Sequence, residues 1–128
     1  MRILFFGSDT FGIPCLEILK RNYQIIGVVT AFDKPKGRGL KILPTPVKEW
    51  AQMNGIDVFQ PEVFDDNFLK KVEKLSPDLI VLISYGKILP ASLLNIPKIA
   101  SINVHPSLLP KYRGPAPIEW TLINGETK

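Results

Sequence analysis

The sequence of 128 residues contains one cysteine and one histidine. Cys15 cannot form a disulfide bond within the chain, so the composition excludes the disulfide framework of a small secreted domain. A structural zinc site takes about four ligands, nearly all of them Cys or His, and Cys15 and His105 alone cannot supply them. We therefore expect no metal site built by this chain.

Long apolar segments are also absent. The first apolar run, residues 3–6, leads directly into Gly7-Ser8-Asp9 and is too short for a signal peptide. The run from Leu79 to Ile83 is far below the ~20 residues that cross a bilayer as a helix. These runs predict a soluble cytoplasmic protein with no membrane partner.

A strong excess of charge of one sign is lacking too. Lys and Arg number 16 against 12 Asp and Glu, which gives a formal net charge of +4. This mildly basic balance is compatible with an anionic partner such as RNA, but it does not identify one. With 45% apolar and 22% charged residues, the chain has the composition of an ordinary globular domain.

The sequence does contain short, continuous apolar runs that alternate with helical patterns. Such runs are typical of strands that are buried on both faces of a parallel sheet. We predict strands at residues 3–6, 25–29, 79–83 and 99–104, and helices at residues 14–21 and 65–75. The predicted fold is α/β, with an open, doubly wound, mostly parallel sheet of the Rossmann-like type.

A last helix is expected to begin at Pro117, to pack through Trp120 and Leu122-Ile123, and to end at Gly125. Because Lys128 follows so closely, we expect this domain to be truncated. Between Thr30 and Val47, by contrast, five prolines and glycines predict no regular element. This basic segment is either a solvated surface loop or a functional loop, and its composition alone does not decide between them.

The first turn of the sheet reads Gly7-Ser8-Asp9-Thr10-Phe11-Gly12. It lacks the middle glycine of the dinucleotide-binding fingerprint, which lets the main chain approach a pyrophosphate. No Gly-Lys-Ser/Thr string of a phosphate-binding loop is present either. We interpret this turn as structural.

Asn103 and His105 are two residues apart, so both side chains face the same way on an extended segment. Pro106 favours that extended geometry. The pair ends a predicted strand, where open α/β sheets bind their ligands. An amide that polarises a carbonyl and an imidazole that moves a proton suit acyl transfer to an amine. Spacing alone favours the alternative of two polar residues satisfied at a strand end.

The wider string Ile102-Asn103-Val104-His105-Pro106-Ser107-Leu108-Leu109-Pro110-Lys111-Tyr112-Arg113-Gly114 resembles the active-site segment of the folate-dependent formyltransferases. The resemblance implies an open α/β sheet and 10-formyltetrahydrofolate as the co-substrate. It implies that Asn103 polarises the carbonyl and that His105 shuttles the proton. The residues that it implies at the folate are Ser107, Leu108, Leu109 and Pro110.

A second segment, Ser84 to Pro90, is similar to the loop through which this family binds the pterin, largely by main-chain groups. Gly86 allows a close turn, and Ile88 and Leu89 are expected to form an apolar wall for a flat ring. The folate-binding residues that the resemblance implies here are Tyr85, Gly86, Lys87, Ile88, Leu89 and Pro90.

Three further strings resemble the branch of the family that formylates initiator methionyl-tRNA, namely residues 1–7, 33–39 and 44–48. In that branch a basic inserted loop reaches the acceptor end of the tRNA. Positive side chains on a glycine-containing loop suit an RNA backbone. The resemblance therefore implies an RNA partner and no DNA partner, with tRNA-binding residues Lys34, Lys36, Arg38, Lys41 and Arg113.

The family's third catalytic residue, an Asp, lies downstream of Lys128. We therefore expect residues 1–128 to be the N-terminal part of the catalytic domain, without its remainder and without an RNA-binding domain, and to be weakly active or inactive alone. Other interpretations remain open at this point. They are a formyltransferase acting on a sugar nucleotide or glycinamide ribonucleotide, a formyl-folate hydrolase, and a non-catalytic folate- or RNA-binding module.

Overall fold

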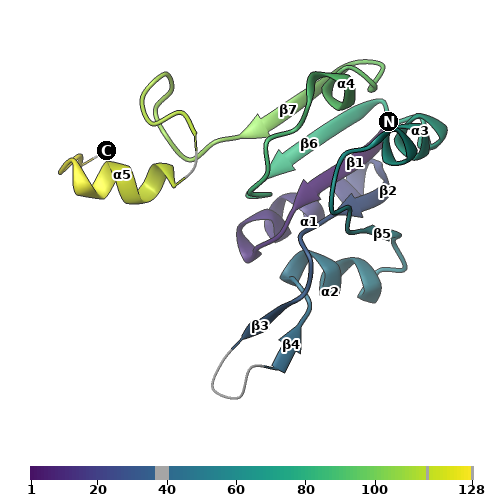
Figure 1. Cartoon of the computed structure of the whole chain (residues 1–128), viewed down its shortest axis with the longest axis horizontal. Coiled ribbons are helices and arrows are strands. Elements are labelled where there is room, and N and C mark those ends of the chain that lie inside the picture. The colour runs from purple at the N-terminus through teal and green to yellow at the C-terminus, as the bar shows by residue number, and fades with distance from the viewer. Residues whose placement is uncertain (37–40, 115, 128) are drawn as a thin grey trace.

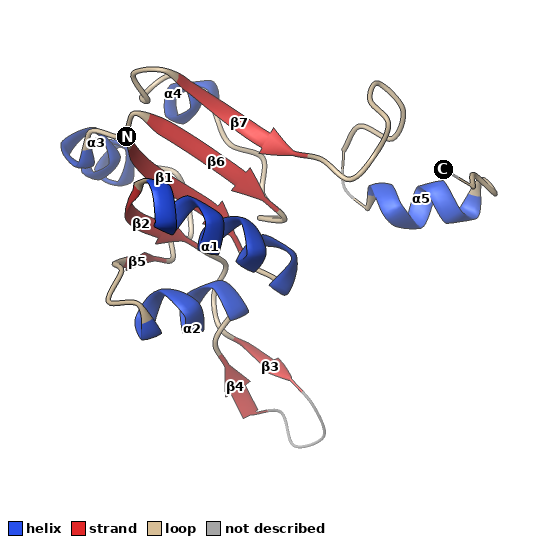
Figure 2. Ribbon diagram, turned by 180° about the vertical axis from the view of Figure 1, so that it is seen from behind, coloured by secondary structure: helices blue, strands red, loops and turns tan. Residues whose placement is uncertain are grey.

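The computed structural model describes residues 1–36, 41–114 and 116–127. Its centre is a five-stranded, wholly parallel sheet in the order β5-β2-β1-β6-β7, with helices on both faces (Figures 1 and 2). The strands are β1 (Arg2–Gly7), β2 (Gln24–Val29), β5 (Val58–Phe59), β6 (Leu79–Ile83) and β7 (Ala100–Val104). The predicted α/β sheet and its four predicted strands are confirmed.

The side chains of β1 alternate between two hydrophobic cores. Ile3 and Phe5 pack on the face covered by α1 (Ile13–Asn22) and α2 (Pro46–Met53). Leu4 and Phe6 pack on the opposite face, which α3 (Asp66–Leu75) and α4 (Ala91–Leu94) cover. All four side chains are fully buried, and each such burial stabilises the fold by about 1.5–3 kcal/mol. A continuous apolar run is therefore what this central strand requires.

Local signals set where the helices begin. The Asp65 carboxylate accepts a hydrogen bond from Phe68 N at 2.9 Å, so the predicted helix at 65–75 starts at Asp66 with Asp65 as its cap. Thr45 caps α2 in the same way, with Lys48 N donating at 3.1 Å. The predicted helix at 14–21 is confirmed as α1. Helix α2 had not been predicted.

The strand order reverses at β1, which lies between β2 and β6. The chain builds outward from β1 to β2 and β5, then crosses to β6 and β7 on the other side. A Cβ atom at Gly7 would lie 2.7 Å from the Ile83 carbonyl oxygen, so only glycine lets the end of β1 approach β6 this closely. The reversal creates a crevice at the carboxyl ends of these two strands.

The prediction of no regular element between Thr30 and Val47 was wrong. Strands β3 (Lys34–Lys36) and β4 (Lys41–Leu43) pair as an antiparallel hairpin, with Pro35 opposite Ile42. Both strands of a two-stranded ribbon are edge strands, and an edge position tolerates a proline whose missing N–H would point away from the partner. The hairpin projects away from the sheet beyond α2 (Figures 1 and 2).

Helix α5 (Pro117–Ile123) begins where it was predicted, and Gly125 follows it with a positive φ of 67°. The expected packing was wrong, because Trp120 is 52% exposed and Leu122 and Ile123 are more exposed still. The helix lies apart from the sheet, beyond β7 (Figure 1), and its apolar side chains are exposed. Among the described helices, none is long and apolar enough to span a bilayer.

Candidate functional site at the carboxyl edge of the sheet

Strands β6 and β7 bring the two predicted site segments together. Their parallel register pairs Leu82 with Asn103 and Ile83 with Val104. Ser84 and His105 follow these paired residues, so the two connections begin at adjacent strand ends. The register brings the two strand ends together, and the expectation that Asn103, His105 and the segment after Ile83 line one pocket stays a prediction. Neither of the two hollows described below is lined by both segments.

His105 is half-buried, and its Nε2 atom lies 2.9 Å from the main-chain oxygen of Tyr112. Since a carbonyl oxygen only accepts hydrogen bonds, Nε2 carries the hydrogen and Nδ1 keeps its lone pair in the neutral ring. Asn103 is exposed, and no described residue forms a hydrogen bond with its side chain. The amide of Asn103 and the Nδ1 atom of His105 are therefore free to act on a bound molecule.

The segment after His105 folds on itself through short-range bonds. Ser107 N donates to His105 O at 2.9 Å, and the Ser107 hydroxyl donates to Lys111 O at 2.8 Å. Leu108, Leu109 and Pro110 are exposed around this turn. The expected folate residues of this segment thus present an apolar rim beside His105.

Glu126, beyond α5, anchors the same segment. Its carboxylate accepts hydrogen bonds from Lys111 Nζ at 2.9 Å and from the Tyr112 hydroxyl at 3.1 Å. The Lys111 ammonium, with the Tyr112 hydroxyl, lowers the pKa of Glu126, and the same carboxylate raises the pKa of Lys111. These contacts tie the turn that carries the Tyr112 carbonyl to the chain after α5.

In the segment from Ser84 to Pro90, buried and exposed positions separate the expected folate residues into two groups. Ile88 is 95% exposed, whereas Leu89 is 7% exposed and packs into the core beneath α4. The expectation that both form an apolar wall is therefore wrong for Leu89. Tyr85 is buried too, edge-on to Phe6 with ring centroids 5.3 Å apart. Burial raises the pKa of Tyr85 to about 12, and no described group bonds to its hydroxyl.

Gly86 and Lys87 form the tip of this segment. Gly86 has a positive φ of 83°, and a Cβ added there would meet nothing within 4 Å, so its main chain is open to a ligand. The Lys87 ammonium donates to the carbonyls of Pro61 and Glu62 at 3.0 Å each. Lys87 therefore braces the segment against the loop after β5, and Pro90 stands at the start of α4.

A small hollow of about 180 Å³ opens at the carboxyl ends of β1, β2 and β6, where the strand order reverses. Its walls combine strand-end residues with the base of the hairpin: Ser8, Asp9, Ala31, Phe32, Lys34, Leu43, Pro44, Thr45 and Ser84. The turn at Ser8 and Asp9, which the sequence indicates as structural only, thus also lines a hollow. The position of this turn at the end of the first strand of a doubly wound sheet was the available signal for a site.

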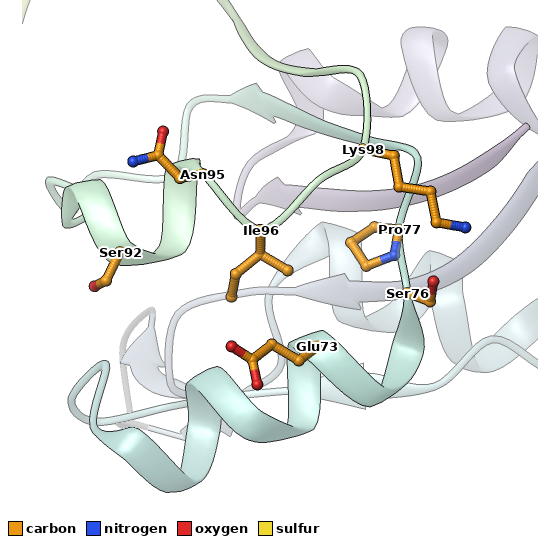
Figure 3. Close-up of a pocket in the computed structure, with 7 residues that line it drawn as sticks. All are labelled: Glu73, Ser76, Pro77, Ser92, Asn95, Ile96 and Lys98. Atoms are coloured by element: carbon orange, nitrogen blue, oxygen red, sulfur yellow. The ribbon is translucent and has the colours of Figure 1, made fainter.

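A larger hollow, of about 380 Å³, lies at the opposite edge of the sheet (Figure 3). It is lined by Glu73 and Ser76 from the end of α3, by Ser92 and Asn95 around α4, and by Pro77, Ile96 and Lys98. Because Asp78 and Ile99 immediately precede β6 and β7, this hollow is at the amino edge of the sheet. Open parallel sheets bind ligands at the carboxyl edge, so the smaller hollow is the better candidate.

The expected tRNA-binding residues fall in two places. Lys34 and Lys41 are exposed on the hairpin, and Arg113 is exposed on the loop before α5. The main chain of Lys36 pairs with Lys41, and Arg38 lies outside the described residues. The hairpin and the loop before α5 lie well apart in both views (Figures 1 and 2). Within the described part of the chain, no group of three or more His, Cys, Asp or Glu residues could hold a metal ion.

Comparison with known proteins identifies relatives of this sheet and site. A sequence model of the family described as formyl transferase matches residues 1–128. The methionyl-tRNA formyltransferase of Clostridioides difficile (strain 630) is 54% identical over 130 residues, which cover 100% of this chain and 42% of that protein. That of Syntrophus aciditrophicus is 55% identical over 128 residues, covering 98% of this chain and 41% of the relative.

Solved structures resemble the fold. Glycinamide ribonucleotide transformylase 1 from Geobacillus kaustophilus superposes with a TM-score of 0.74 at 23% identity, covering 97% of this chain and 68% of its own. Phosphoribosylglycinamide formyltransferase from Bacillus halodurans does so with a TM-score of 0.74 at 20% identity, covering 97% of this chain and 66% of its own. At these identities the likeness concerns the fold alone. The chain spans about 42% of the length of the curated relatives that it matches.

Proposed function

The chain belongs to the formyl transferase family, and we propose on that premise that it serves to transfer a formyl group from 10-formyltetrahydrofolate to the amino group of initiator methionyl-tRNA. Residues 1–128 would form the N-terminal part of the catalytic domain. Relatives that share about half of its residues are named for methionyl-tRNA, which supports this acceptor.

The observation that carries the proposal is the pairing of Ile83 with Val104. This register puts the open main chain of Gly86 and the side chains of Asn103 and His105 on adjacent strand ends. A formyl donor held by one segment would thus lie within reach of the polar groups of the other.

Main-chain groups of the Tyr85–Pro90 segment would hold the folate, together with the exposed rim of Ser107 to Pro110. The fit rests on the open space at Gly86 and on the exposure of Ile88 and Leu108. The Lys87 ammonium is already engaged by two carbonyls, so Lys87 would contribute through its main chain. Tyr85 and Leu89 would support the segment from the core beneath it.

10-Formyltetrahydrofolate supplies an electrophilic formyl carbon when it is bound. The Asn103 amide would donate a hydrogen bond to the formyl oxygen, where negative charge develops as the amine attacks. The Nδ1 atom of His105 would accept the proton that the attacking amine loses and would return it to the folate nitrogen, which leaves as tetrahydrofolate when its bond to the formyl carbon breaks. The Tyr112 carbonyl would keep Nε2–H in place and thereby direct Nδ1 toward the reaction.

The acceptor would be held by the basic side chains of the hairpin and of the loop before α5. Lys34, Lys41 and Arg113 are exposed and can meet phosphates, and we extend the same role to Lys36 and Arg38. A projecting hairpin suits a long, charged acceptor better than a small ribonucleotide amine, which would need no arm outside the crevice.

A direct test compares acceptors in the intact protein. Formyl transfer from 10-formyltetrahydrofolate would be measured with initiator methionyl-tRNA and with glycinamide ribonucleotide at matched concentrations. We expect transfer to methionyl-tRNA only. Transfer to the ribonucleotide alone would reassign the acceptor, release of formate without an acceptor would indicate a hydrolase, and folate binding without turnover would indicate a binding module.

A further inference from the structure

The β3–β4 hairpin joins the sheet through two root segments, residues 30–33 and residues 44–48. Two side-chain contacts link these two segments to each other. The hydroxyl oxygens of Thr30 and Thr45 lie 2.6 Å apart. Asp33, directly before β3, accepts a hydrogen bond through its carboxylate from Lys48 Nζ, in the first turn of α2, at 2.6 Å. The two roots are thus joined to each other by a hydroxyl pair and by an ion pair.

The same side chains also anchor the roots to the sheet. Gln60, directly after β5, donates from Nε2 to Ala31 O at 2.7 Å and to Asp33 Oδ1 at 2.9 Å. Its Oε1 accepts from Lys48 Nζ at 3.0 Å. The Gln60 amide therefore bonds to both members of the ion pair, Asp33 through Nε2 and Lys48 through Oε1. It also holds the main chain at Ala31, between β2 and the hairpin.

On the side of β1, the anchor is Ser8. Its Oγ accepts from Ala31 N at 3.1 Å and from the Thr30 hydroxyl at 3.4 Å. Thr30 shares a second hydrogen bond with the Thr45 hydroxyl, in which either oxygen can be the donor. Thr30, in the middle of these hydroxyl groups, is 1% exposed, whereas Ser8 and Thr45 are half-buried and line the small hollow. The Thr30 hydroxyl is therefore shielded from water, and its hydrogen bonds matter more.

Apolar packing does little to orient the hairpin. Ile42 is 71% exposed, and Leu43 and Phe32 are both more than two-fifths exposed. The hollow of about 180 Å³ separates the hairpin base from the strand ends at Ser8 and Ser84. Val47 anchors one root in the core, but the described residues of the hairpin strands form no buried apolar seam with the sheet. The direction in which the hairpin leaves the sheet (Figure 2) therefore depends largely on the polar contacts of its roots.

We propose that Asp33 and Lys48 are positioning residues, which hold the hairpin in the direction from which it meets the RNA acceptor. This inference rests on the proposed function. The inference also gives different roles to the lysines of the hairpin strands and to the lysine of its root. Lys34 and Lys41 are exposed for phosphate contacts, whereas Lys48 is neutralised by Asp33 and serves the roots. Asp33 and Lys48 would touch neither folate nor RNA.

The structural part of the proposal is tested without RNA, by hydrogen exchange on the intact protein. Asp33→Asn and Lys48→Met should each speed amide exchange in residues 31–36 and 41–48 and leave β1 and β6 unchanged. Glu49→Gln is the matched control for Asp33→Asn, because it also removes one negative charge. Glu49 is next to Lys48 in the sequence, and no described residue bonds to its carboxylate. Exchange that is unchanged in both variants, or equally fast in the control, overturns the proposal.

The functional part is tested by steady-state kinetics on the same proteins. Either substitution should raise the KM for methionyl-tRNA about tenfold, below the ~100-fold that a misplacement at the reacting atoms causes. The kcat and the KM for 10-formyltetrahydrofolate should remain unchanged. The double variant should be less impaired than the sum of the two single ones, since both substitutions remove the Asp33–Lys48 contact. Asp33→Glu should retain most of the affinity for RNA.

The outcomes of the two tests are distinguishable. Additive effects, or a change in kcat alone, would overturn the positioning role even if the protein formylates methionyl-tRNA. If the wild-type protein does not formylate methionyl-tRNA, the proposed function is overturned, and so is the role of Asp33 and Lys48 in RNA binding. Faster exchange in that case would still establish that Asp33 and Lys48 hold the hairpin.

Discussion

The Nε2 atom of His105 is bonded to the main-chain oxygen of Tyr112, seven residues further along the chain. Tyr112 has a positive φ of 54°, a conformation that non-glycine residues adopt rarely and at a cost in free energy. The bent main chain at Tyr112 thus selects which ring nitrogen of His105 can act as a base. A constraint of this kind is typical of sites in which a side chain must be oriented before a substrate binds.

We expect Asn103→Ala to lower kcat for formyl transfer by about 10²–10³, because one hydrogen bond to a developing oxyanion is lost. His105→Ala should lower it by about 10²–10⁴, the range for a general base. Single-turnover rates in the intact protein measure both effects. Asn95→Ala, at the amino edge of the sheet, is the control and should leave the rate unchanged. A change in KM with kcat intact would contradict the assigned roles.

Ile88 and Leu89 should respond to the same substitution in opposite ways. Leu89→Ala removes a core side chain and should lower the free energy of unfolding by about 2–5 kcal/mol. Ile88→Ala changes an exposed side chain, so its stability should stay within about 0.5 kcal/mol of wild type, while folate binding weakens severalfold. Urea denaturation and folate titration separate the two effects. Unimpaired folate binding by Ile88→Ala would remove Ile88 from the site.

Lys41→Ala should make RNA binding less sensitive to salt. A lysine that neutralises one phosphate contributes about one unit to the slope of log K against log salt concentration, and its removal should lower that slope by about one. Binding of methionyl-tRNA would be titrated at several salt concentrations. Lys70→Ala on α3, far from the hairpin, is the control. An unchanged slope for Lys41→Ala would mean that this lysine meets no phosphate.

The contact between Asp33 and Lys48 should be lost only in acid. The Lys48 ammonium, helped by the Gln60 amide, lowers the pKa of the Asp33 carboxyl below its usual range. A group with a lowered pKa stabilises the folded state fully above its ordinary pKa of about 3.9, and this contribution is lost as the pH falls through the lowered value. Amide NMR shifts of residues 31–36 should therefore be constant from neutral pH to about pH 4 and move below it.

The Asp33→Asn variant provides the control for that titration. It lacks the carboxyl group, so the same amide shifts should show no acid transition. A transition near neutral pH in the wild-type protein, or one that survives in Asp33→Asn, would assign the effect to another group.

The sheet could be predicted because each central strand is marked by its own apolar run in the sequence. Residues 3–6 and 79–83 are continuous apolar runs, and burial on both faces leaves no other place for them. The caps of the helices were also readable where a side chain acts locally, as Asp65 does. These features depend on neighbours in sequence.

Features that depend on distant neighbours were missed. Ile88 and Leu89 are adjacent and equally apolar, and only the position of α4 decides that Leu89 enters the core. The polar contacts of the hairpin roots join residues 33, 48 and 60, which no local pattern connects. The apolar face of α5 has the pattern of a packed helix, although nothing in the described structure covers it. The assigned roles of Asn103 and His105 remain predictions.

The order of the strands has a consequence for how acceptor preference can change. The hairpin follows β2, the open main chain of Gly86 follows β6, and Asn103 and His105 end β7. Strand β1 separates the first of these connections from the other two. Lengthening, shortening or replacing the hairpin would therefore leave the register between Ile83 and Val104 intact. If the hairpin meets the acceptor as proposed, replacing this one connection would change the acceptor while the segments proposed for the chemistry keep their positions.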